Sequence, residues 1–322
     1  MNPVDNWRVE CACVQGAAHV RTGAPCQDAV HGQAFAWKAD RRWILAVADG
    51  HGSKPRADEG AQFAVEAFVD LLKESGLERG DEAVDGLDPA DESRFEGFED
   101  FRGRFARRLL ARWRELLEAA PARASEAESE SQPASDAEVE TWKRWKAFGT
   151  TLTGALILPD EVFLGRIGDS DAFLVYEPSG AGPLIVENPF ADADADSGLI
   201  GLETHSLSSR EAHLHWRTAR RSMEGYPDQR RLVALVLATD GFADSFADPE
   251  KVVRAMIQDT RRRGSAWLAV QLRAGLERFT NEGSGDDIGM VVLFREEPGP
   301  AEVVAGEVLE TNEDAGGGEA AT

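Results

Sequence analysis

The sequence predicts an α+β fold in which antiparallel sheets lie between layers of helices. Apolar runs of strand length come in groups, such as 150–158 and 162–167, which the turn pair Pro159-Asp160 joins as a hairpin. Helical patterns occupy the intervals between these groups. A doubly wound fold would instead alternate strand and helix regularly, so sheets packed inside helical layers are favoured.

The first third of the chain predicts two strands and then a helix. Residues 7–20 alternate in the manner of a strand, and residues 43–48 form a buried apolar run that ends in an Asp-Gly turn. Ser53 followed by Pro55 is typical of a helix cap and first turn. The helix behind them has an apolar face that consists of Ala61, Ala64, Val65, Phe68 and Leu72.

The middle of the chain predicts a second helix and a β-rich block. Residues 78–100 are acidic and punctuated by glycine, and the helix after them has an apolar face that consists of Phe101, Phe105, Leu109, Trp113 and Leu116. Residues 120–140 are rich in Ala, Ser and Glu, which predicts a solvated insert without a core. The hairpin block continues through a Gly-Asp-Ser turn into a strand at 172–176, so we expect an antiparallel meander.

The last third predicts two further buried strands, at 232–238 and 288–294, which enclose two helices. The helical patterns have apolar positions at Val252, Met256, Trp267, Val270, Leu272 and Leu276. The acidic stretch 191–198 lacks the spaced glycine and terminal glutamate of a calcium loop, which favours a plain surface loop. We therefore expect one domain over 1–296, with the acidic insert near 120–140, and a disordered acidic tail over 297–322.

Composition excludes several classes of partner. The chain has 35 Lys and Arg against 58 Asp and Glu, a formal charge of −23, so phosphate backbones and anionic membranes would repel it. Neither a signal peptide nor a run of membrane-spanning length is evident. The three cysteines, Cys11, Cys13 and Cys26, do not suggest a disulfide scaffold, and we expect Cys11 and Cys13 to fill the core. A cytoplasmic, reduced, monomeric protein is the expectation.

Four aspartates follow apolar runs or sit in glycine-tight turns: Asp49, Asp169, Asp240 and Asp286. A carboxylate that leaves a strand beside glycine is exposed at a sheet edge, with room for an ion next to the backbone. Four such segments suggest converging carboxylates, which hard divalent cations such as Mg²⁺ and Mn²⁺ prefer. Each Asp-Gly alone is more commonly an ordinary turn, so the prediction depends on the set.

Two such ions, held about 3.5–4 Å apart, would lower the pKa of a water that they share. They would also neutralise the negative charge of a phosphoryl group. The reaction class that needs both effects is hydrolysis of a phosphate ester by in-line attack. His51 lies two residues after Asp49 and is a candidate proton donor to the leaving oxygen. A loop histidine that bonds a backbone carbonyl is the alternative for His51.

The motifs, taken in order, resemble those of the metal-dependent serine/threonine protein phosphatases of type 2C. The pattern GxxHxxxGxPCQDA, from Gly16 to Ala29, is similar to that of a bacterial subgroup. The resemblance covers roughly residues 10–295. The matching segments are CQDA at 26–29, VADGHGS at 47–53, GTTLTGALI at 149–157, GRIGDSDAFLV at 165–175, LATDGFADSF at 237–246 and SGDDIGMVVL at 284–293.

The resemblance implies a four-layer α/β/β/α sandwich of two antiparallel sheets with metals at one end. It implies that Asp49 bridges two ions, that Gly50 adds its carbonyl, and that Asp240 and Asp286 complete the first ion's ligands. It also implies that Asp28 orients water bound to the ions. Asp169, together with Asp240, would offer a looser third-ion site. His51 falls where the family places its candidate general acid.

The sequence departs from the family pattern at the expected phosphate grip. Many members carry an arginine five residues before the aspartate of the acidic pair, and here that position is Gly23. Arg21 or His19 is the candidate replacement. The usual glutamate beside Asp28 is Gln27. In addition, the usual Asn-x-Thr after the last metal aspartate reads Asp287-Ile288-Gly289, and the usual arginine after GDS is Asp171.

Three functions remain open on these residues. The first is a phosphatase for phosphoserine and phosphothreonine in proteins, with Ser/Thr kinases or their substrates as targets. The second is a pseudophosphatase that binds a phosphorylated partner without turnover, suggested by Gly23 and the acidic insert. The third is a phosphatase for a small phosphorylated metabolite. Retention of the metal aspartates favours an enzyme, because carboxylates crowded without an ion repel one another.

Overall fold

A computed structural model describes residues 6–37, 40–77, 98–121, 137–191, 204–225 and 230–296. The acidic loop 191–198 lies outside the described residues apart from Ala191, as does the tail 297–322. Of the expected insert 120–140, the structure describes only the two ends, and 137–140 already belong to a helix. None of the helices in the described ranges is long and apolar enough to span a membrane.

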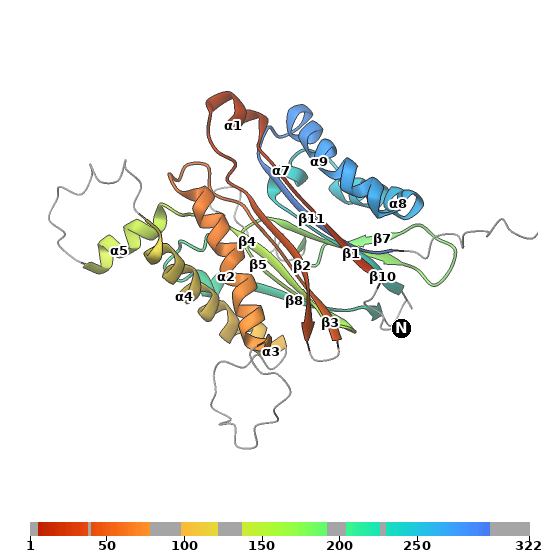
Figure 1. Cartoon of the computed structure of the whole chain (residues 1–322), viewed down its shortest axis with the longest axis horizontal. Helices are drawn as coiled ribbons and strands as arrows, with labels where there is room; N and C mark the ends of the chain where they lie inside the picture. The colour runs from red at the N-terminus through yellow and green to blue at the C-terminus, as the bar shows by residue number, and fades with distance from the viewer. Residues whose placement is uncertain are drawn as a thin grey trace, which may run out of the picture.

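Two antiparallel sheets form the centre of the molecule (Figure 1), which confirms the predicted α+β architecture. In the first sheet the order is β1-β11-β10-β6-β7, and β9 pairs with β10; in the second it is β2-β3-β4-β5-β8. Their bounds are β1 Trp7–Val14, β2 Ala29–Trp37, β3 Asp40–Ala48, β4 Leu152–Ile157, β5 Glu161–Ile167, β6 Asp171–Glu177, β7 Ile185–Glu187, β8 Arg217–Ser222, β9 Glu224–Gly225, β10 Arg230–Ala238 and β11 Ile288–Arg295.

Helices cover the outer face of each sheet, as Figure 1 shows. On the second sheet these are α2 and its neighbours α3 and α4; on the first they are α7, α8 and α9, and the short α1 stands at one end. Their bounds are α1 Ala17–Thr22, α2 Ala57–Leu77, α3 Phe98–Arg102, α4 Arg104–Ala119, α5 Ala137–Lys146, the 3-10 turn η1 Ala212–His215, α7 Asp240–Ala243, α8 Pro249–Arg263 and α9 Ser265–Glu282.

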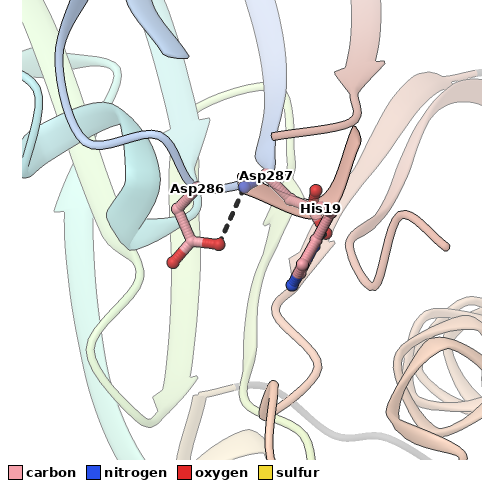
Figure 2. A group of neighbouring side chains, drawn as sticks. All are labelled: His19, Asp286 and Asp287. Atoms are coloured by element: carbon pink, nitrogen blue, oxygen red, sulfur yellow. Dashed lines mark hydrogen bonds and ion pairs between the residues drawn. The ribbon is translucent and has the colours of Figure 1, made fainter. Parts of the chain in front are cut away.

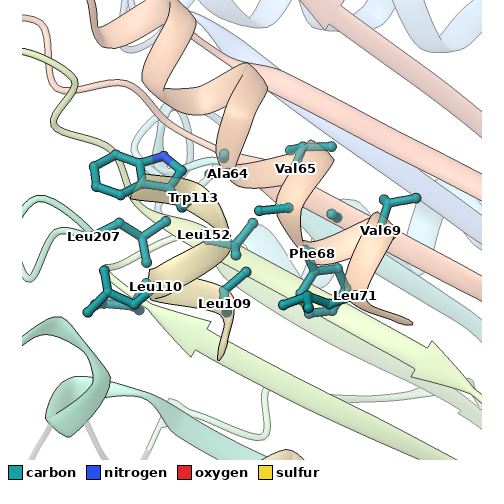
Figure 3. Close-up of a cluster of buried hydrophobic side chains, with 14 of the residues drawn as sticks. Ala64, Val65, Phe68, Val69, Leu71, Leu109, Leu110, Trp113, Leu152 and Leu207 are labelled. Atoms are coloured by element: carbon teal, nitrogen blue, oxygen red, sulfur yellow. The ribbon is translucent and has the colours of Figure 1, made fainter. Parts of the chain in front are cut away.

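The hydrophobic core forms three layers that match this arrangement. One cluster lies between the two sheets, and one lies between each sheet and its helices. Figure 3 shows the layer between α2, α4 and β4, where Phe68, Trp113 and Leu152 are fully buried. Each such side chain stabilises the fold by about 1.5–3 kcal/mol. The indole nitrogen of Trp113 also donates to the carbonyl of Gly60 at 3.0 Å, which fixes α4 against α2.

Local expectations differ from the structure at the N-terminal strand. Residues 7–20 do not form one strand, because β1 ends at Val14 and 17–22 form α1. The close packing of Gly16 against the backbone of Asp286 explains the end of the strand: a Cβ on Gly16 would overlap it. The chain also forms β2, which the sequence reading did not identify.

The predicted helix start and the predicted meander also need correction. The helix α2 begins at Ala57, after a turn, and not at the Ser53-Pro55 pair. The strands β4 and β5 form the expected hairpin, but β6 leaves that sheet and pairs with β10. The crossing occurs at Gly168, whose φ of 102° is a conformation that glycine adopts without strain.

Two predicted core positions are on the surface. Cys11 is exposed and Cys13 is only partly buried, so the expectation that both fill the core is wrong. Val270 is 69% exposed, whereas Leu272 and Leu276 on the same helix are buried. Cys11 and Cys13 are on β1, which is the edge strand of its sheet and has a neighbouring strand on one side only.

Candidate metal centre

Strand register brings the predicted aspartates to one end of the sandwich. Asp49 follows the end of β3 and Asp28 precedes β2, and these strands pair with Ala29 opposite Ala48. Asp240 follows β10 and Asp286 lies just before β11, and these strands pair with Ala238 opposite Met290. Antiparallel neighbours therefore place the start of one strand beside the end of the next.

Asp169 reaches the same end from the crossing between the sheets. It lies in the turn between β5 and β6, and the first residue of β6, Asp171, pairs with Ala238 of β10. One carboxylate oxygen from each of Asp49, Asp169 and Asp240 lies within 4.8 Å of the others. The structure thus brings together side chains that are separated by as many as 191 positions in the sequence.

The electrostatics of this cluster favour a bound cation. Burial, and then the charges of Asp240, Asp169 and Asp286, raise the pKa of Asp49 well above its ordinary value. Burial and the charges of Asp169, Asp286 and Asp244 likewise raise the pKa of Asp240, to about 7. Carboxylates crowded in this way repel one another, and a divalent cation with oxygen ligands would remove the repulsion. The donor set therefore fits Mg²⁺ or Mn²⁺.

Gly50 is held in a position where only glycine fits. Its nitrogen donates to the carbonyl of Gln27 at 3.1 Å, and a Cβ here would approach the carbonyl oxygens of Ala57 and Gln27 to 2.6 Å and 2.7 Å. The backbone that follows β3 can therefore pass close to the cluster, and the carbonyl of Gly50 is a candidate ligand.

Asp28 lies behind the cluster rather than within it. Its carboxylate accepts a hydrogen bond from Thr239 Oγ1 at 2.7 Å, and its side chain is 8% exposed. Burial, and then the charge of Asp49, raise the pKa of Asp28 well above its ordinary value. Gly289 allows this arrangement, because a Cβ at that position would lie 3.4 Å from the Asp28 carboxylate and closer still to Val30. The Asp28 carboxylate therefore lies next to that of Asp49.

His51 lies within electrostatic reach of Asp169. Its backbone nitrogen donates to the carbonyl of Gly149 at 2.9 Å, which fixes the loop after β3 against the start of β4. Burial lowers the pKa of the His51 imidazole, the charge of Asp169 raises it, and Lys54 lowers it further. A half-buried imidazole near a carboxylate cluster has the location that a proton donor requires.

Asp286 belongs to a second group, shown in Figure 2 with His19 and Asp287. One ligand atom from each of the three lies within 4.8 Å of the others. The carboxylate of Asp286 accepts a hydrogen bond from the backbone nitrogen of Asp287 at 2.8 Å. Although Asp286 is not part of the first group, its charge raises the pKa of both Asp49 and Asp240, so it faces the same space.

Asp287 joins three parts of the chain at this end. Its buried carboxylate accepts hydrogen bonds from the backbone nitrogens of Gly16 at 2.5 Å and Gln27 at 2.6 Å. It also pairs with His19 Nδ1 at 2.9 Å. These contacts fix α1 and the segment before Asp28 to the start of β11, and they place the His19 ring beside Asp286.

Comparison with known proteins identifies the fold and the family. The model of the family described as protein phosphatase 2C matches residues 15–277. The chain belongs to this family. No curated protein matches the chain in sequence.

Solved structures of bacterial phosphatases are similar to the chain in fold. The catalytic domain of the serine/threonine phosphatase PstP, solved with two manganese ions, is 20% identical over 90% of this chain and 99% of its own, with a TM-score of 0.51. Stp1 from Staphylococcus aureus is 14% identical over 90% and 95%, with a TM-score of 0.54. The S. agalactiae serine/threonine phosphatase is 13% identical over 90% and 100%, with a TM-score of 0.54.

This protein phosphatase 2C chain differs from the family pattern around α1. Gly23 ends α1 with a φ of 73°, and a side chain here would point into open space, with no atom within 4 Å of a Cβ. Of the two candidate replacements for an arginine at this position, His19 lies beside Asp286, whereas Arg21 is exposed on α1. Gln27 is buried, and its backbone rather than its side chain bonds to Asp287.

Three residues at this end of the protein phosphatase 2C fold were missed by sequence reasoning. Thr239 holds the Asp28 carboxylate, and Thr204 Oγ1 donates to Asp169 at 2.6 Å. Burial, and then the charges of Asp169 and Asp286, raise the pKa of Asp244, so that carboxylate lies within electrostatic reach of the cluster. Thr239 and Asp244 flank Asp240 closely in sequence, which was the available signal. For Thr204 the sequence contained no such signal.

Proposed function

We propose that this chain hydrolyses phosphoserine and phosphothreonine in proteins, with water activated at a centre of two divalent cations. The observation that supports the proposal most directly is the group formed by Asp49, Asp169 and Asp240, in which burial and mutual repulsion raise the pKa of Asp49 and Asp240. When bound, Mg²⁺ or Mn²⁺ would lower the pKa of water and neutralise charge on the phosphoryl group.

The assignment of ligands follows the geometry and the family resemblance together. Asp49 would bridge two ions, and the carbonyl of Gly50 would add a ligand. Asp240 and Asp286 would hold the first ion, and Asp169 with Asp240 would hold a third. Asp28 supports this arrangement from behind, since its carboxylate is fixed by Thr239 and can orient the attacking water.

Two histidines have separate roles in the proposal. His51 donates a proton to the leaving oxygen, because its partly buried imidazole lies within electrostatic reach of Asp169. His19 contacts the substrate phosphate, because its Nδ1 is held by Asp287 and its ring lies beside Asp286. Arg21, on the same helix, is the second candidate for this contact.

The first experiment measures hydrolysis of p-nitrophenyl phosphate by the purified protein with Mn²⁺, with EDTA, and in the variant Asp240→Ala. The proposal expects activity that requires Mn²⁺ and falls by about 10²-fold or more in Asp240→Ala. Asp160→Ala is the matched control, because Asp160 is an exposed aspartate in the β4–β5 turn at the opposite end of the sheet. If Asp240→Ala retains full activity, the proposed centre is wrong.

The substrate class needs a second comparison. Phosphoserine and phosphothreonine peptides should be hydrolysed with higher kcat/KM than small phosphorylated metabolites of equal charge. A preference for the metabolites would select the third function. A folded, Mn²⁺-loaded protein without activity on either class would favour a pseudophosphatase that binds a phosphorylated partner, which the open position at Gly23 also suggests.

The biological setting follows from the same proposal. The natural substrates are phosphorylated proteins, and bacterial Ser/Thr kinases or their targets in the cytoplasm are the proposed partners. We expect the protein to act as a monomer, since the centre is assembled from residues of one chain. Size-exclusion chromatography with light scattering would test this, and a dimer that dissociates with loss of activity would contradict it.

A further inference from the structure

Two cysteines lie side by side at the end of the sandwich that carries the candidate metal centre. Cys13, near the end of β1, and Cys26, in the segment between α1 and β2, have their Sγ atoms 3.4 Å apart. Both are free thiols and partly exposed, so small reagents in solution can reach them. Cys11 lies on the same strand two residues away, is also free and is exposed, which makes it a natural reference.

The thiol pair is directly connected to the segment that holds Asp28. Cys26 precedes Gln27 and Asp28 in the chain, and Cys13 Sγ donates to the backbone carbonyl of Asp28 at 3.5 Å. The same short segment is held from the other side, where the nitrogen of Gln27 donates to Asp287. A displacement of the backbone at Cys26 therefore acts directly on the segment that positions the Asp28 carboxylate.

A disulfide would require only a small movement of the two sulfurs. The S–S bond is about 2.05 Å long, so the sulfurs must approach by roughly 1.3 Å. Part of this movement can come from side-chain rotation, and the rest must come from β1 or from the segment at Cys26. Closure also removes the S–H group with which Cys13 donates to Asp28, because neither sulfur keeps its hydrogen.

We propose that Cys13 and Cys26 form a thiol-oxidation site, at which hydrogen peroxide produces a disulfide that displaces the Asp28 segment and lowers phosphatase activity. One thiol loses its proton, and the thiolate attacks a peroxide oxygen, which breaks the O–O bond and gives a sulfenic acid; the hydroxide that leaves takes up that proton as the first water. The second thiol attacks that sulfur, forms the S–S bond and releases the other water. Two thiols and one peroxide thus give one disulfide and two waters, and a dithiol reductant reverses the change.

The experiment starts from the fully reduced, full-length protein. Its Mn²⁺-dependent hydrolysis of p-nitrophenyl phosphate is measured, the metal is removed, peroxide is added and then destroyed with catalase, and activity is measured again with Mn²⁺. The expected result is an activity loss of about tenfold or more, since a shift of about 1 Å in an active-site group can cost that much. Dithiothreitol should restore the activity.

Variants assign the effect to the pair. Cys13→Ser and Cys26→Ser should each keep their activity after peroxide treatment, because each variant lacks one of the two thiols that the bond joins. Cys11→Ser is the matched control and should lose activity as the unmodified protein does. If Cys13→Ser or Cys26→Ser is inactivated to the same extent as the unmodified protein, the proposal is wrong.

Mass spectrometry provides a readout that does not depend on activity. The oxidised protein should be lighter by two hydrogen atoms. Trypsin cuts after Arg8, Arg21 and Lys38, so Cys13 and Cys26 fall on different peptides, 9–21 and 22–38. Because Cys11 shares the first peptide, the linked product is sought in Cys11→Ser, where only Cys13 can provide the bond to Cys26.

The activity measurement rests on the proposed function, whereas the linked peptide does not. Failure of the proposed function appears as a reduced protein without Mn²⁺-dependent activity, and the peptide then decides the thiol site alone. Addition of oxygen atoms without a linked peptide would overturn the proposal. A linked peptide with undiminished activity would also overturn it, because the closure would then leave Asp28 in place.

Discussion

Asp49 combines a strongly perturbed carboxylate with a firmly held backbone. Burial and three neighbouring carboxylates all raise its pKa, and its backbone carbonyl accepts hydrogen bonds from Thr151 N at 2.8 Å and Thr150 Oγ1 at 2.9 Å. The local structure therefore holds the carboxylate in an unfavourable environment that a bound cation would make favourable. Strongly shifted pKa values of this kind are typical of functional sites.

His51 provides a test of proton donation at the residue scale. In His51→Ala, hydrolysis of phenyl phosphate, which has a poor leaving group, should fall by roughly 10²-fold. Hydrolysis of p-nitrophenyl phosphate should fall much less, because nitrophenolate leaves without a proton. The two kcat values, measured with saturating Mn²⁺, give the comparison. Equal losses on both substrates would argue against a role as acid and in favour of a structural loop histidine.

At the scale of the element, close contacts position the start of α2. Arg56, just before α2, donates its backbone nitrogen to the carbonyl of Ala147 at 3.0 Å. Its guanidinium lies over the ring of Phe148, 4.3 Å from the centroid. These contacts fix the start of α2 beside the loop that carries His51, so the packing of the helix also positions part of the site.

Gly60 and Gly103 provide a matched pair of substitutions in this layer. A Cβ on Gly60 would overlap the backbone of Phe148, so Gly60→Ala should lower the free energy of unfolding by about 1–3 kcal/mol. Gly103, between α3 and α4, is exposed, and the nearest atom to its Cβ is 3.5 Å away. Gly103→Ala should therefore be neutral or stabilise by less than about 1 kcal/mol.

Urea denaturation measured in parallel for both variants checks this pair. The expected order is Gly60→Ala least stable, with Gly103→Ala similar to the unmodified protein. Equal midpoints for the two variants would show that α2 can move away from Phe148 without cost, and the account of how α2 is positioned would have to be abandoned.

At the scale of the whole molecule, the charge cluster connects folding with pH and metal. Asp240 has its pKa raised from 3.8 to about 7, so its protonated form favours the folded state of the ion-free protein. That contribution is complete below about pH 4, the ordinary range of an aspartate, and is lost as the pH rises through 7. With EDTA, the free energy of unfolding should therefore fall between about pH 4 and pH 7.

The variant Asp240→Asn isolates this contribution, because the amide cannot ionise. Its unfolding free energy in EDTA, measured by urea denaturation across the same pH range, should fall less steeply than that of the unmodified protein. At pH 7, Mn²⁺ should raise the melting temperature of the unmodified protein by binding the folded state, and it should do so less in Asp240→Asn. Identical pH profiles for the two proteins would contradict the electrostatic account.

The sequence could predict the site residues in part, because their signals are local. Asp49, Asp169, Asp240 and Asp286 stand at strand ends or glycine turns, and the motifs around them resemble one family in order. Thr204 and Asp287 could not be assigned roles, since their partners lie 35 and 260 or more positions away. The elements with strong periodicity, such as α2 and β10, were predicted for the same local reason.

The sequence by itself determined the apolar runs, the acidic composition and the family motifs. Each of these can be recognised from residues that are close together in the chain. The tertiary structure alone decided that β6 crosses to the other sheet, that residues 17–22 form a helix, and that Cys13 meets Cys26. These outcomes depend on contacts between distant segments. A local pattern cannot encode them, because the free energy that selects them comes from packing the two sheets together.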